Sequence, residues 1–546
     1  MTSLLNLQTV IDDNSVRCRF PARTTWLAQQ LSKPEWKDFS NCDRLNVWAN
    51  FSELESVSLI MISGYFGNPA STFGHSLMRI NNGGQRDSAL LDLGINFGAR
   101  VPPQEPTLRY IIRGLAGGYQ AGFSDRTFFE HDQTYSRVEF RDRWEYTLAL
   151  TADEAHFLTM HIWELAARQF TYYFLEQNCS YRLAELLELV FDRELLSGVT
   201  TWYAPVSLFH DLRDAEATLG RPLFTDVTYV PSVEQVLRYR LAGLTVSEQE
   251  SLFAIADPTL EWTVVVDQLN DHNSTKTRQL MYAAALDYFN YVLAGSEEDE
   301  HHEIRTRRQQ VLQARLGLPV TSNAQPTPPP PRRPPSSRTG PSAIEAGLGH
   351  TENSDNYLAL GIAAFRHRSI GDNSLQGSSL VVADVGFGIA EQEGVFLNYL
   401  DIVRAQKRNA PYFRLPNESK ASWSVAAGVE RRSGICLDCL ESYASGWYGR
   451  AFRAGRSVTI SAGLAGRLSS KGQAVEIGPT ASLQWRPTPH FASAWSATVD
   501  HAPANGRTDM RFTWQARWSL MDRWELNLRA FERDGYNTTV TLTYRH

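Results

Sequence analysis

The feature that most limits how this chain can fold is a change of residue pattern at a Pro-rich segment, residues 317–341. Beyond it, apolar and polar residues alternate with a period of two, as over residues 511–520 and 524–530. Roughly ten to twelve such segments, each near ten residues long, recur back to about Ala346. The alternation predicts an all-β antiparallel barrel over residues 342–546. Its aromatic-rich apolar face favours an outer-membrane barrel over a soluble barrel or sandwich.

The part of the chain before the Pro-rich segment mixes helix and strand patterns, which predicts an α+β fold. At 546 residues the chain is too long for one ordinary domain. We expect a brace segment at residues 1–56, an α+β domain at 57–195, a helical accessory region at 196–316 and an extended linker at 317–341.

The composition argues against several classes of function. A net charge of -7 and a pI near 6.0, without a basic stripe, give no sign of a nucleic-acid partner. No apolar run approaches the length of a membrane-spanning helix, and no signal peptide is visible at Met1. No residue pattern indicates a metal site, and we expect no cofactor.

The chain has five cysteines, an odd number. Two disulfides, Cys18–Cys42 and Cys436–Cys439, would use four of them and leave Cys179 unpaired, which marks it as a candidate reactive thiol. The C-x-x-C pair alone also fits a redox or zinc motif, but no second ligand pair accompanies it, so a structural bridge is favoured. The bridges would indicate an oxidising compartment.

Cys179 stands where a helix is expected to begin. Asn178 is a good N-cap residue, and apolar residues recur at helical spacing over residues 181–190. In the first turn, unpaired backbone N–H groups and the helix dipole would stabilise a thiolate and lower the pKa of Cys179. The alternative is a small buried cysteine with no chemical role.

A nucleophilic thiol needs a base, and His75 is the leading candidate. The residues around Asn81–Gly84 predict a hairpin turn, and a symmetrical hairpin would place His75 opposite Asp92. Asp92 could then orient the imidazole, with Asn96 on the same strand as the second choice. The alternative for Asp92 is a solvated strand residue.

Two further segments lie between the histidine and the cysteine. The Gly-rich residues 114–122 lack the Lys and Ser/Thr of a phosphate loop, and we interpret them as a flexible loop near the site. Arg141, Asp142 and Glu145 belong to a charged stretch that could form a polar network under the site or the outer face of a strand.

Residues 58–190 carry four motifs in order: Asn68–His75, Gly114–Gly122, Arg141–Tyr146 and Glu176–Ser180. On these motifs the region resembles the domain formerly called DUF4105, now named after the periplasmic N-terminal domain of the lipoprotein intramolecular transacylase Lnb. The C-terminal region is similar to a barrel-like extension in Gram-negative relatives.

The resemblance implies a circularly permuted papain-like (NlpC/P60-like) domain in which the histidine strand precedes the cysteine helix. It implies a Cys-His site for acyl transfer or hydrolysis, with Cys179 as nucleophile, His75 as base, and Asp92 or Asn96 orienting the imidazole. The supporting residues on the matching motifs and beside them are Asn178, Ser71, Tyr181, Arg141, Asp142 and Glu145.

The function expected on these grounds is a thiol acyltransferase or lipid-ester hydrolase acting on a lipid or lipoprotein substrate. The membrane would be reached through the C-terminal barrel, in the periplasm and outer membrane of a Gram-negative bacterium. Two alternatives remain: a cell-wall amidase or peptidase of the same thiol class, and a non-catalytic barrel or assembly protein of the envelope. The sequence makes no prediction of the oligomeric state.

Overall fold

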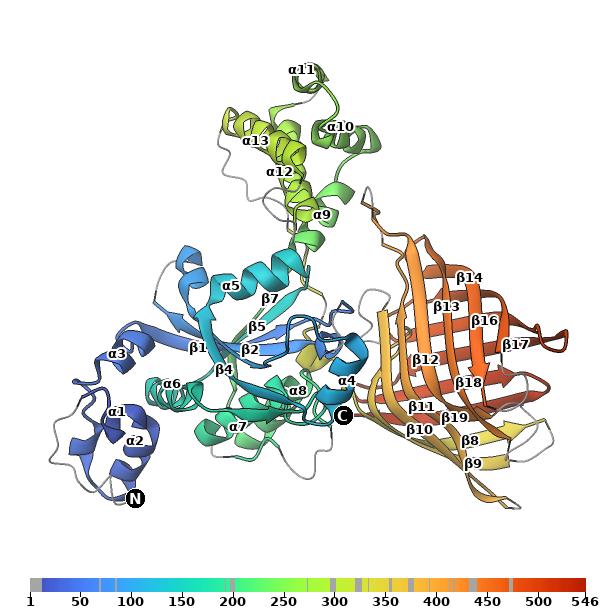
Figure 1. The fold of residues 1–546 in the computed structure, drawn as a ribbon, viewed down its shortest axis with the longest axis horizontal. Helices are drawn as coiled ribbons and strands as arrows, with labels where there is room; N and C mark the ends of the chain where they lie inside the picture. Colours follow the sequence, from blue (N-terminus) through green and yellow to red (C-terminus); the bar gives the residue numbers. More distant parts are fainter. Residues whose placement is uncertain are drawn as a thin grey trace. The chain divides into compact units, whose positions relative to one another are not determined.

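We describe the fold from a computed structural model of the chain (Figure 1). The described residues are 12–546 except 68–69, 84–85, 192, 197–201, 273, 295–300, 320–326, 332, 353–355, 372–377, 392, 412, 416–417, 432–438 and 471–474. The chain forms two compact units, residues 1–334 and 335–546. Each unit is described by itself.

The first unit is built on a seven-stranded sheet in the order β6-β4-β3-β2-β1-β5-β7, with all neighbours antiparallel. Its strands are β1 (Leu54–Ile62), β2 (His75–Asn82), β3 (Leu93–Ala99), β4 (Tyr119–Thr127), β5 (Arg143–Leu148), β6 (Phe170–Tyr172) and β7 (Phe224–Val230). Successive residues point to opposite faces, so Leu59 and Met78 enter the main core while Ile60 and Leu77 enter a second cluster on the other face.

Helices cover both faces of this sheet. The main-core face packs against α6 (Ala152–Ala166), α7 (Cys179–Phe191) and α8 (Ser207–Leu219), and the other cluster includes Phe128 of α5 (Phe128–Asp132). Figure 1 shows α6 and α7 together beneath the sheet and α5 above it. A capping box starts α6, since the side chains of Thr151 and Glu154 each accept the backbone N–H of the other residue. The remaining short elements of this region are η2 (Ala70–Phe73), η3 (Arg86–Leu91), α4 (Thr107–Leu115) and η4 (Gln133–Val138).

The expected domain boundary at residue 195 is too early. Helix α8 packs on α7, and β7 pairs with β5 at the edge of the sheet, so both belong to the α+β domain. The helical region that was predicted beyond the sheet is present but begins at residue 233. It consists of α9 (Val233–Ala242), α10 (Val246–Ala256), α11 (Trp262–His272), α12 (Thr275–Val292) and α13 (His302–Leu316).

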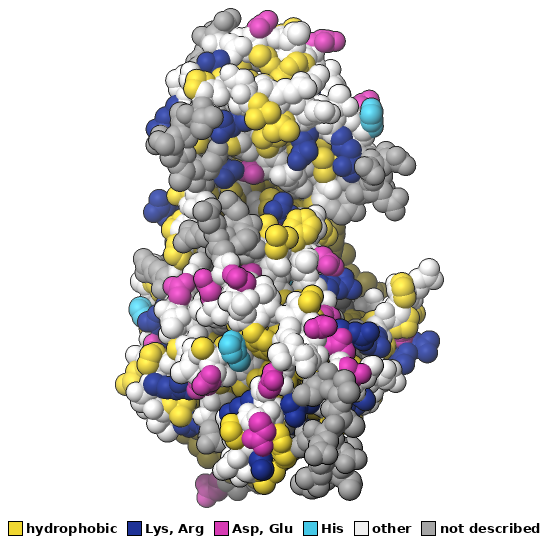
Figure 2. Space-filling view, turned by 90° about the vertical axis from the view of Figure 1, so that its left-hand side faces the viewer, with side chains coloured by type: hydrophobic (Ala, Val, Ile, Leu, Met, Phe, Trp, Pro, Cys, Tyr) yellow, Lys and Arg dark blue, Asp and Glu magenta, His cyan; other side chains and the backbone are white. Residues whose placement is uncertain are grey.

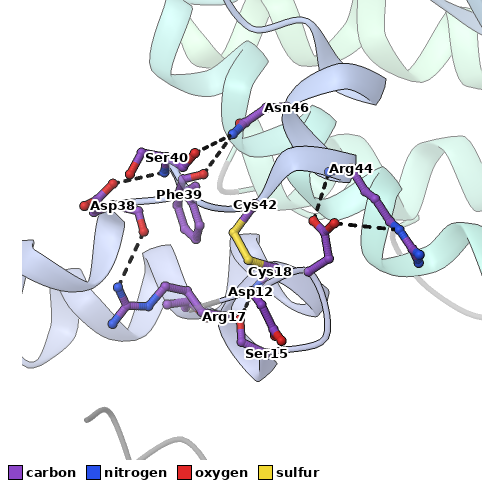
Figure 3. Close-up of a disulfide and its surroundings, with 12 residues drawn as sticks. Asp12, Ser15, Arg17, Cys18, Asp38, Phe39, Ser40, Cys42, Arg44 and Asn46 are labelled. Carbon is purple, nitrogen blue, oxygen red and sulfur yellow. Dashed lines mark hydrogen bonds and ion pairs between the residues drawn. A yellow bond between two sulfur atoms is a disulfide. The ribbon is translucent and has the colours of Figure 1, made fainter. Parts of the chain in front are cut away.

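The N-terminal segment braces the sheet domain through α6. It contains α1 (Val16–Arg19), α2 (Pro21–Gln30), η1 (Pro34–Lys37) and α3 (Asp43–Ala49). The predicted Cys18–Cys42 disulfide joins the start of this segment to α3 (Figure 3). Trp163 of α6 donates its indole N–H to the Cys18 carbonyl at 2.9 Å, which ties the bridge to the domain.

Only one cysteine of the second predicted disulfide lies among the described residues. Cys439 is disulfide-bonded, and its predicted partner, Cys436, lies outside the described residues. Cys179 is the free cysteine among the described residues.

The second unit is a closed barrel of twelve antiparallel strands, which confirms the predicted barrel, and the strand number lies within the predicted range of ten to twelve. The strands are β8 (Ala343–Thr351), β9 (Asn356–His367), β10 (Ser378–Ala390), β11 (Gly394–Lys407), β12 (Ala421–Arg431), β13 (Leu440–Ala454), β14 (Val458–Ser469), β15 (Val475–Trp485), β16 (Phe491–Ala502), β17 (Arg507–Ser519), β18 (Trp524–Glu532) and β19 (Tyr536–Arg545).

The two surfaces of the barrel differ in polarity. Large apolar side chains stay exposed on the outer surface, among them Ile344, Leu348, Ile362, Leu464, Val540 and Leu542. Charged side chains are buried inside, where Arg366 contacts Glu345 at 2.7 Å and Asp384 at 2.8 Å. An apolar exterior around a polar interior, with an even strand number, is the architecture of an outer-membrane barrel. Within the described part of the chain, no helix has the length and hydropathy needed to cross a membrane.

One connection folds into the barrel. Residues 368–371 follow β9, yet Arg486, just after β15, donates to the Ser369 carbonyl at 2.9 Å, and Arg517 of β17 donates to the Ile370 carbonyl at 2.8 Å. Strand β15 stands opposite β9 in the barrel order. This segment therefore crosses the interior near the end of the barrel where β8 starts and β19 ends.

Surface charge is mixed in the view of Figure 2. Acidic and basic side chains are interspersed there and are not gathered by sign. A surface of this kind has no extended field of one sign over that face.

The disulfide supplies a first prediction. Replacing Cys18 and Cys42 together by serine removes a cross-link that spans 24 residues and should lower the free energy of unfolding of the first unit by about 3 kcal/mol. Thermal unfolding followed by circular dichroism of the full chain would measure it. The matched control is Cys179→Ser, which removes a buried thiol but no cross-link; an equal loss of stability in both variants would contradict the bracing role.

Candidate active site

The N-terminus of α7 is fixed by Asn178, which is buried. Its side-chain oxygen accepts hydrogen bonds from the backbone N–H groups of Ser180 at 3.1 Å and Tyr181 at 3.3 Å. Its side-chain amide donates to the Phe174 carbonyl at 3.2 Å and to the carbonyl of Tyr203. The predicted N-cap is therefore confirmed, and Asn178 also joins the helix to two loops.

Cys179 is the first residue of α7, as the pattern predicted, but it is not exposed. Its exposed fraction is 2%, and burial raises the pKa of the thiol. Hydrogen bonds from the backbone of Ser76 and Ser180 favour the thiolate, but their effect on the pKa is smaller than that of burial. The predicted lowering of the pKa was wrong, because helix-terminal stabilisation was weighed without the cost of desolvation.

His75 is the first residue of β2, and its partner is Asn96. The His75 Nε2 and Asn96 Oδ1 atoms lie 2.7 Å apart. Because an amide oxygen only accepts, Nε2 carries the hydrogen and Nδ1 of the neutral ring is free of one. Burial, together with the nearby charge of Arg141, lowers the pKa of His75 to about 3. At neutral pH the ring is therefore an uncharged base.

Asp92 does not lie opposite His75, and the predicted hairpin register was wrong. Leu93 pairs with Ile80, so Asp92 stands at the other end of β2 from His75. There its carboxylate accepts the backbone N–H of Asn82 at 3.1 Å and contacts Arg79 at 3.6 Å. The cause is η3, which lengthens the connection between β2 and β3 beyond a tight turn and moves the pairing toward Asn96.

The charged stretch before β5 divides into two environments. Arg141 is buried near the site: its guanidinium donates to the Ser63 carbonyl at 2.6 Å and lies 5.1 Å from the Tyr135 ring centroid. Asp142 instead accepts the backbone N–H of Ser232 at 2.9 Å, ahead of α9. Glu145 pairs with Arg143 and Arg79 on the sheet. Only Arg141 of these three acts on the site.

A cavity of about 150 Å³ brings the main residues together. The lining residues are Ser71, Phe73, Gly74, His75, Asn96, Phe97, Gly98, Tyr135, Tyr172, Phe174, Asn178, Cys179 and Pro205. Five of the residues expected at the site do not line it: Asp92, Arg141, Asp142, Glu145 and Tyr181. The thiol, the imidazole and the amide that orients it therefore share one small space, whose wall also includes five Phe and Tyr rings.

Sequence reasoning missed the residues that hold the two halves of this site together. Ser180 Oγ lies 2.7 Å from Ser76 Oγ and 2.9 Å from the Pro205 carbonyl, all beside residues of the cavity. Each serine directly follows a predicted catalytic residue, which is the signal that could have found them. Tyr135 was also missed; its ring centroid is 5.5 Å from that of His75.

The Gly-rich segment is ordered structure and not a flexible loop. Residues 107–115 form α4, and β4 begins at Tyr119. The Gly114 carbonyl accepts the Phe174 backbone N–H at 2.9 Å, and a side chain at Gly114 would overlap the Phe174 ring. Glycine is required there because helix and ring approach closely.

This arrangement can perform nucleophilic chemistry at a thiol with a neutral histidine as base. Among the described residues, no three His, Cys, Asp or Glu side chains lie close enough together to hold a metal ion.

Comparison with known families agrees with this division of the chain. Residues 44–214 match the family described as the Lnb N-terminal periplasmic domain, and residues 340–546 match a domain of unknown function, DUF7840. None of the curated proteins compared with the chain matches it.

Several solved outer-membrane proteins resemble the barrel. The KdgM porin has 11% identity and a TM-score of 0.24 over 37% of this chain and 99% of its own. The NanC porin has 6% identity and a TM-score of 0.24, covering 37% of this chain and 99% of its own. Omp33 of Acinetobacter baumannii has 10% identity and a TM-score of 0.23, covering 38% of this chain and 100% of its own. At these low scores, the membrane assignment depends on the two surfaces of the barrel itself.

The chain is therefore a two-part envelope protein. It carries a Lnb N-terminal periplasmic domain, followed by a twelve-strand barrel of outer-membrane type. A periplasmic domain joined to such a barrel places the protein in the periplasm and outer membrane of a Gram-negative bacterium.

The buried thiol gives a second prediction. Because its pKa is raised, alkylation of Cys179 by iodoacetamide in the folded protein should accelerate only at a pH above that of an ordinary cysteine. The same chain in denaturant, with its disulfides intact, is the control. A fast reaction already complete at neutral pH in the folded protein would reveal a thiolate–imidazolium pair and contradict the neutral site.

Proposed function

We propose that the first unit is a cysteine-dependent acyltransferase or hydrolase that cleaves lipid or lipoprotein esters through an acyl-thioester on Cys179. The observation that carries this proposal is the shared cavity, in which a thiol and a neutral imidazole oriented by Asn96 line the same space. General-base attack starts from a neutral Cys179 thiol and a neutral His75 imidazole, and burial favours the neutral form of each.

The proposed reaction has two stages. In the first, the Cys179 sulfur bonds to the acyl carbon, its proton passes to Nδ1 of His75, and the ester C–O bond breaks as the departing alcohol takes that proton. In the second, an amine or water attacks the thioester, its proton returns through His75 to the sulfur, and the acylated product leaves. Asn96 keeps the imidazole in the required tautomer throughout.

The surface beside the cavity supports a lipid substrate. Helix α4 carries Ile112 and Leu115 with exposed fractions of 57% and 48%, one turn apart on one side of the helix. Arg109 lies on the same short helix and is also exposed. The helix is joined to the cavity wall, since Tyr110 packs edge-on against Phe174 at 5.0 Å. Arg109 and Arg113 share one carboxylate, Glu105, which leaves a net positive charge beside the exposed apolar residues, as suits an anionic lipid surface.

A cell-wall amidase of the same thiol class is the second candidate, and the cavity size favours it. A space of about 150 Å³ holds the groups around a scissile bond but not a whole long acyl chain. A lipid substrate would have to lie with most of its chain outside, along α4 or in the membrane.

The nucleophile and its partners give a third prediction. Intact mass spectrometry after incubation with a diacylated lipopeptide or phospholipid should detect an added acyl mass on the wild-type chain and none on Cys179→Ser. His75→Ala should slow turnover about 10²- to 10⁴-fold and Asn96→Ala about tenfold or more. Asp92→Asn is the matched control, because it alters a carboxylate outside the cavity. Retained turnover in Cys179→Ser would remove the proposal, and an adduct formed only with an activated peptide would favour the amidase.

The pH profile gives a fourth prediction. His75 works only when unprotonated, and its pKa is lowered to about 3. Activity should therefore persist well below pH 6.5, the ordinary range of histidine, and fall only as the pH approaches 3. The measurement is kcat/KM against pH with a soluble ester. An acid limb near the ordinary histidine value would contradict the assignment of His75 as the buried base.

The role of α4 gives a fifth prediction. Ile112→Glu with Leu115→Glu should raise KM for a vesicle-bound substrate at least tenfold and leave turnover of a short soluble ester unchanged. The control is Val47→Glu, a highly exposed apolar residue on α3. Equal losses on both substrates would point to damage of the cavity wall and not to a lipid-docking surface.

A further inference from the structure

At the end of the barrel where the chain enters and leaves, five neighbouring strands, β15 to β19, carry aromatic side chains, which we call the aromatic belt. Strand β8 starts and β19 ends at this end, so the five connections on it join β9–β10, β11–β12, β13–β14, β15–β16 and β17–β18. The belt residues lie at the strand ends there: Trp485, Phe491, Trp518, Trp524 and Tyr544. Such belts sit at the membrane–water interface.

This end of the barrel faces the periplasm. The residues that enter β8 follow directly from the unit that contains the Lnb N-terminal periplasmic domain. An even number of strands returns the chain to the same side of the membrane. The aromatic belt therefore marks the interface of the periplasmic leaflet.

A basic pocket lies at this interface. It has a volume of about 740 Å³ between the β11–β12 connection and strand β13. The lining residues are Arg414, Leu415, Glu418, Ser419, Lys420, Ala421, Tyr448, Gly449 and Arg450. Arg450 pairs with Ala421, the first residue of β12, which places it beside the periplasmic end of that strand.

The outer wall of the pocket faces lipid. Tyr448 and Phe452 of β13 have exposed fractions of 67% and 58%, and Arg450 between them shares their side of the strand. An arginine on the lipid-facing side of a barrel is costly at mid-membrane and nearly free of cost at the interface. Its position therefore fits a site that opens sideways into the headgroup layer.

Two cations of the pocket are available to a ligand. Within the described residues, Arg450 and Lys420 make no hydrogen bond or ion pair. Arg414 instead shapes the loop, donating to the carbonyls of Ser419 at 3.1 Å and Asn409 at 3.0 Å. The carboxylate of the pocket, Glu418, accepts the Leu415 backbone N–H at 3.0 Å. Three basic groups against one carboxylate leave the pocket positive.

We propose that this pocket binds the phosphate headgroup of a membrane phospholipid in the periplasmic leaflet. Arg450 and Lys420 contact the phosphate, and the exposed ring of Tyr448 lies along the upper part of an acyl chain. The site is independent of the thiol chemistry, since it belongs to the barrel unit.

The test is native mass spectrometry of the full chain carrying Cys179→Ser, so that any hydrolysis of lipid is removed from the result. The protein in detergent is mixed with phosphatidylglycerol, with diacylglycerol of the same chains, or with inorganic phosphate. The expected result is a phosphatidylglycerol adduct that falls at least tenfold in Arg450→Gln with Lys420→Gln. Arg456→Gln is the matched control, an exposed cation on the neighbouring β13–β14 turn that does not line the pocket.

Each other outcome overturns the proposal. An unchanged adduct in the double variant would place the lipid elsewhere, and an equal loss in Arg456→Gln would reduce the effect to general surface charge. Equal binding of diacylglycerol would remove the role of the phosphate. Binding of inorganic phosphate that displaces the lipid at comparable concentration would make this a free-anion site. A far-UV circular dichroism melt shared by all variants establishes that the barrel has folded.

Discussion

The candidate site depends on one buried contact, the hydroxyl of Ser180 against Ser76 and the Pro205 carbonyl. It fastens the first turn of α7 to the start of β2, two segments separated by about a hundred residues. Since each serine is the neighbour of a candidate catalytic residue, the contact sets the relative position of Cys179 and His75. Buried hydrogen-bonded groups are costly to separate, so the alignment is stiff.

Burial also determines the chemical character of this site. A thiolate–imidazolium pair needs solvation or strong counter-charges, and the cavity supplies mainly aromatic walls, with Arg141 repelling a positive ring. Burial therefore favours a neutral resting pair, and in the proposed reaction charge would develop only as a substrate binds and reacts. The thiol of Cys179 would then react only when a substrate fills the cavity, which would protect this free cysteine from oxidation in an oxidising compartment.

The barrel has the reverse arrangement of polarity, with charged side chains inside and apolar side chains outside. Period-two alternation produces this arrangement within each strand, and arginine–carboxylate pairs such as Arg366 with Glu345 fill the interior. The residues 368–371 cross that interior to the far wall. The interior is thus occupied by ion pairs and by chain, and the outer surface carries the lipid-facing features.

Much of this organisation could be predicted because it depends on neighbours in the chain. The alternation around Trp514 and Trp524 determined the barrel, and the cap at Asn178 determined where α7 begins. The pairing of Cys18 with Cys42 was expected because Cys436 and Cys439 form a close pair of their own in the sequence. The third site residue could not be predicted this way. Whether Asp92 or Asn96 meets His75 depends on the β2–β3 register, which η3 shifts, and no local pattern encodes that shift.

The pKa of Cys179 likewise depended on tertiary structure. Local sequence determined that the thiol begins a helix, whose terminal amides favour a thiolate. Only the packed walls decided that desolvation outweighs them, because burial is contributed by residues far apart in the chain, from Phe73 to Pro205. Sequence by itself determined the elements and the chemistry available; tertiary structure decided which groups meet and in what charge state, since both depend on long-range contacts.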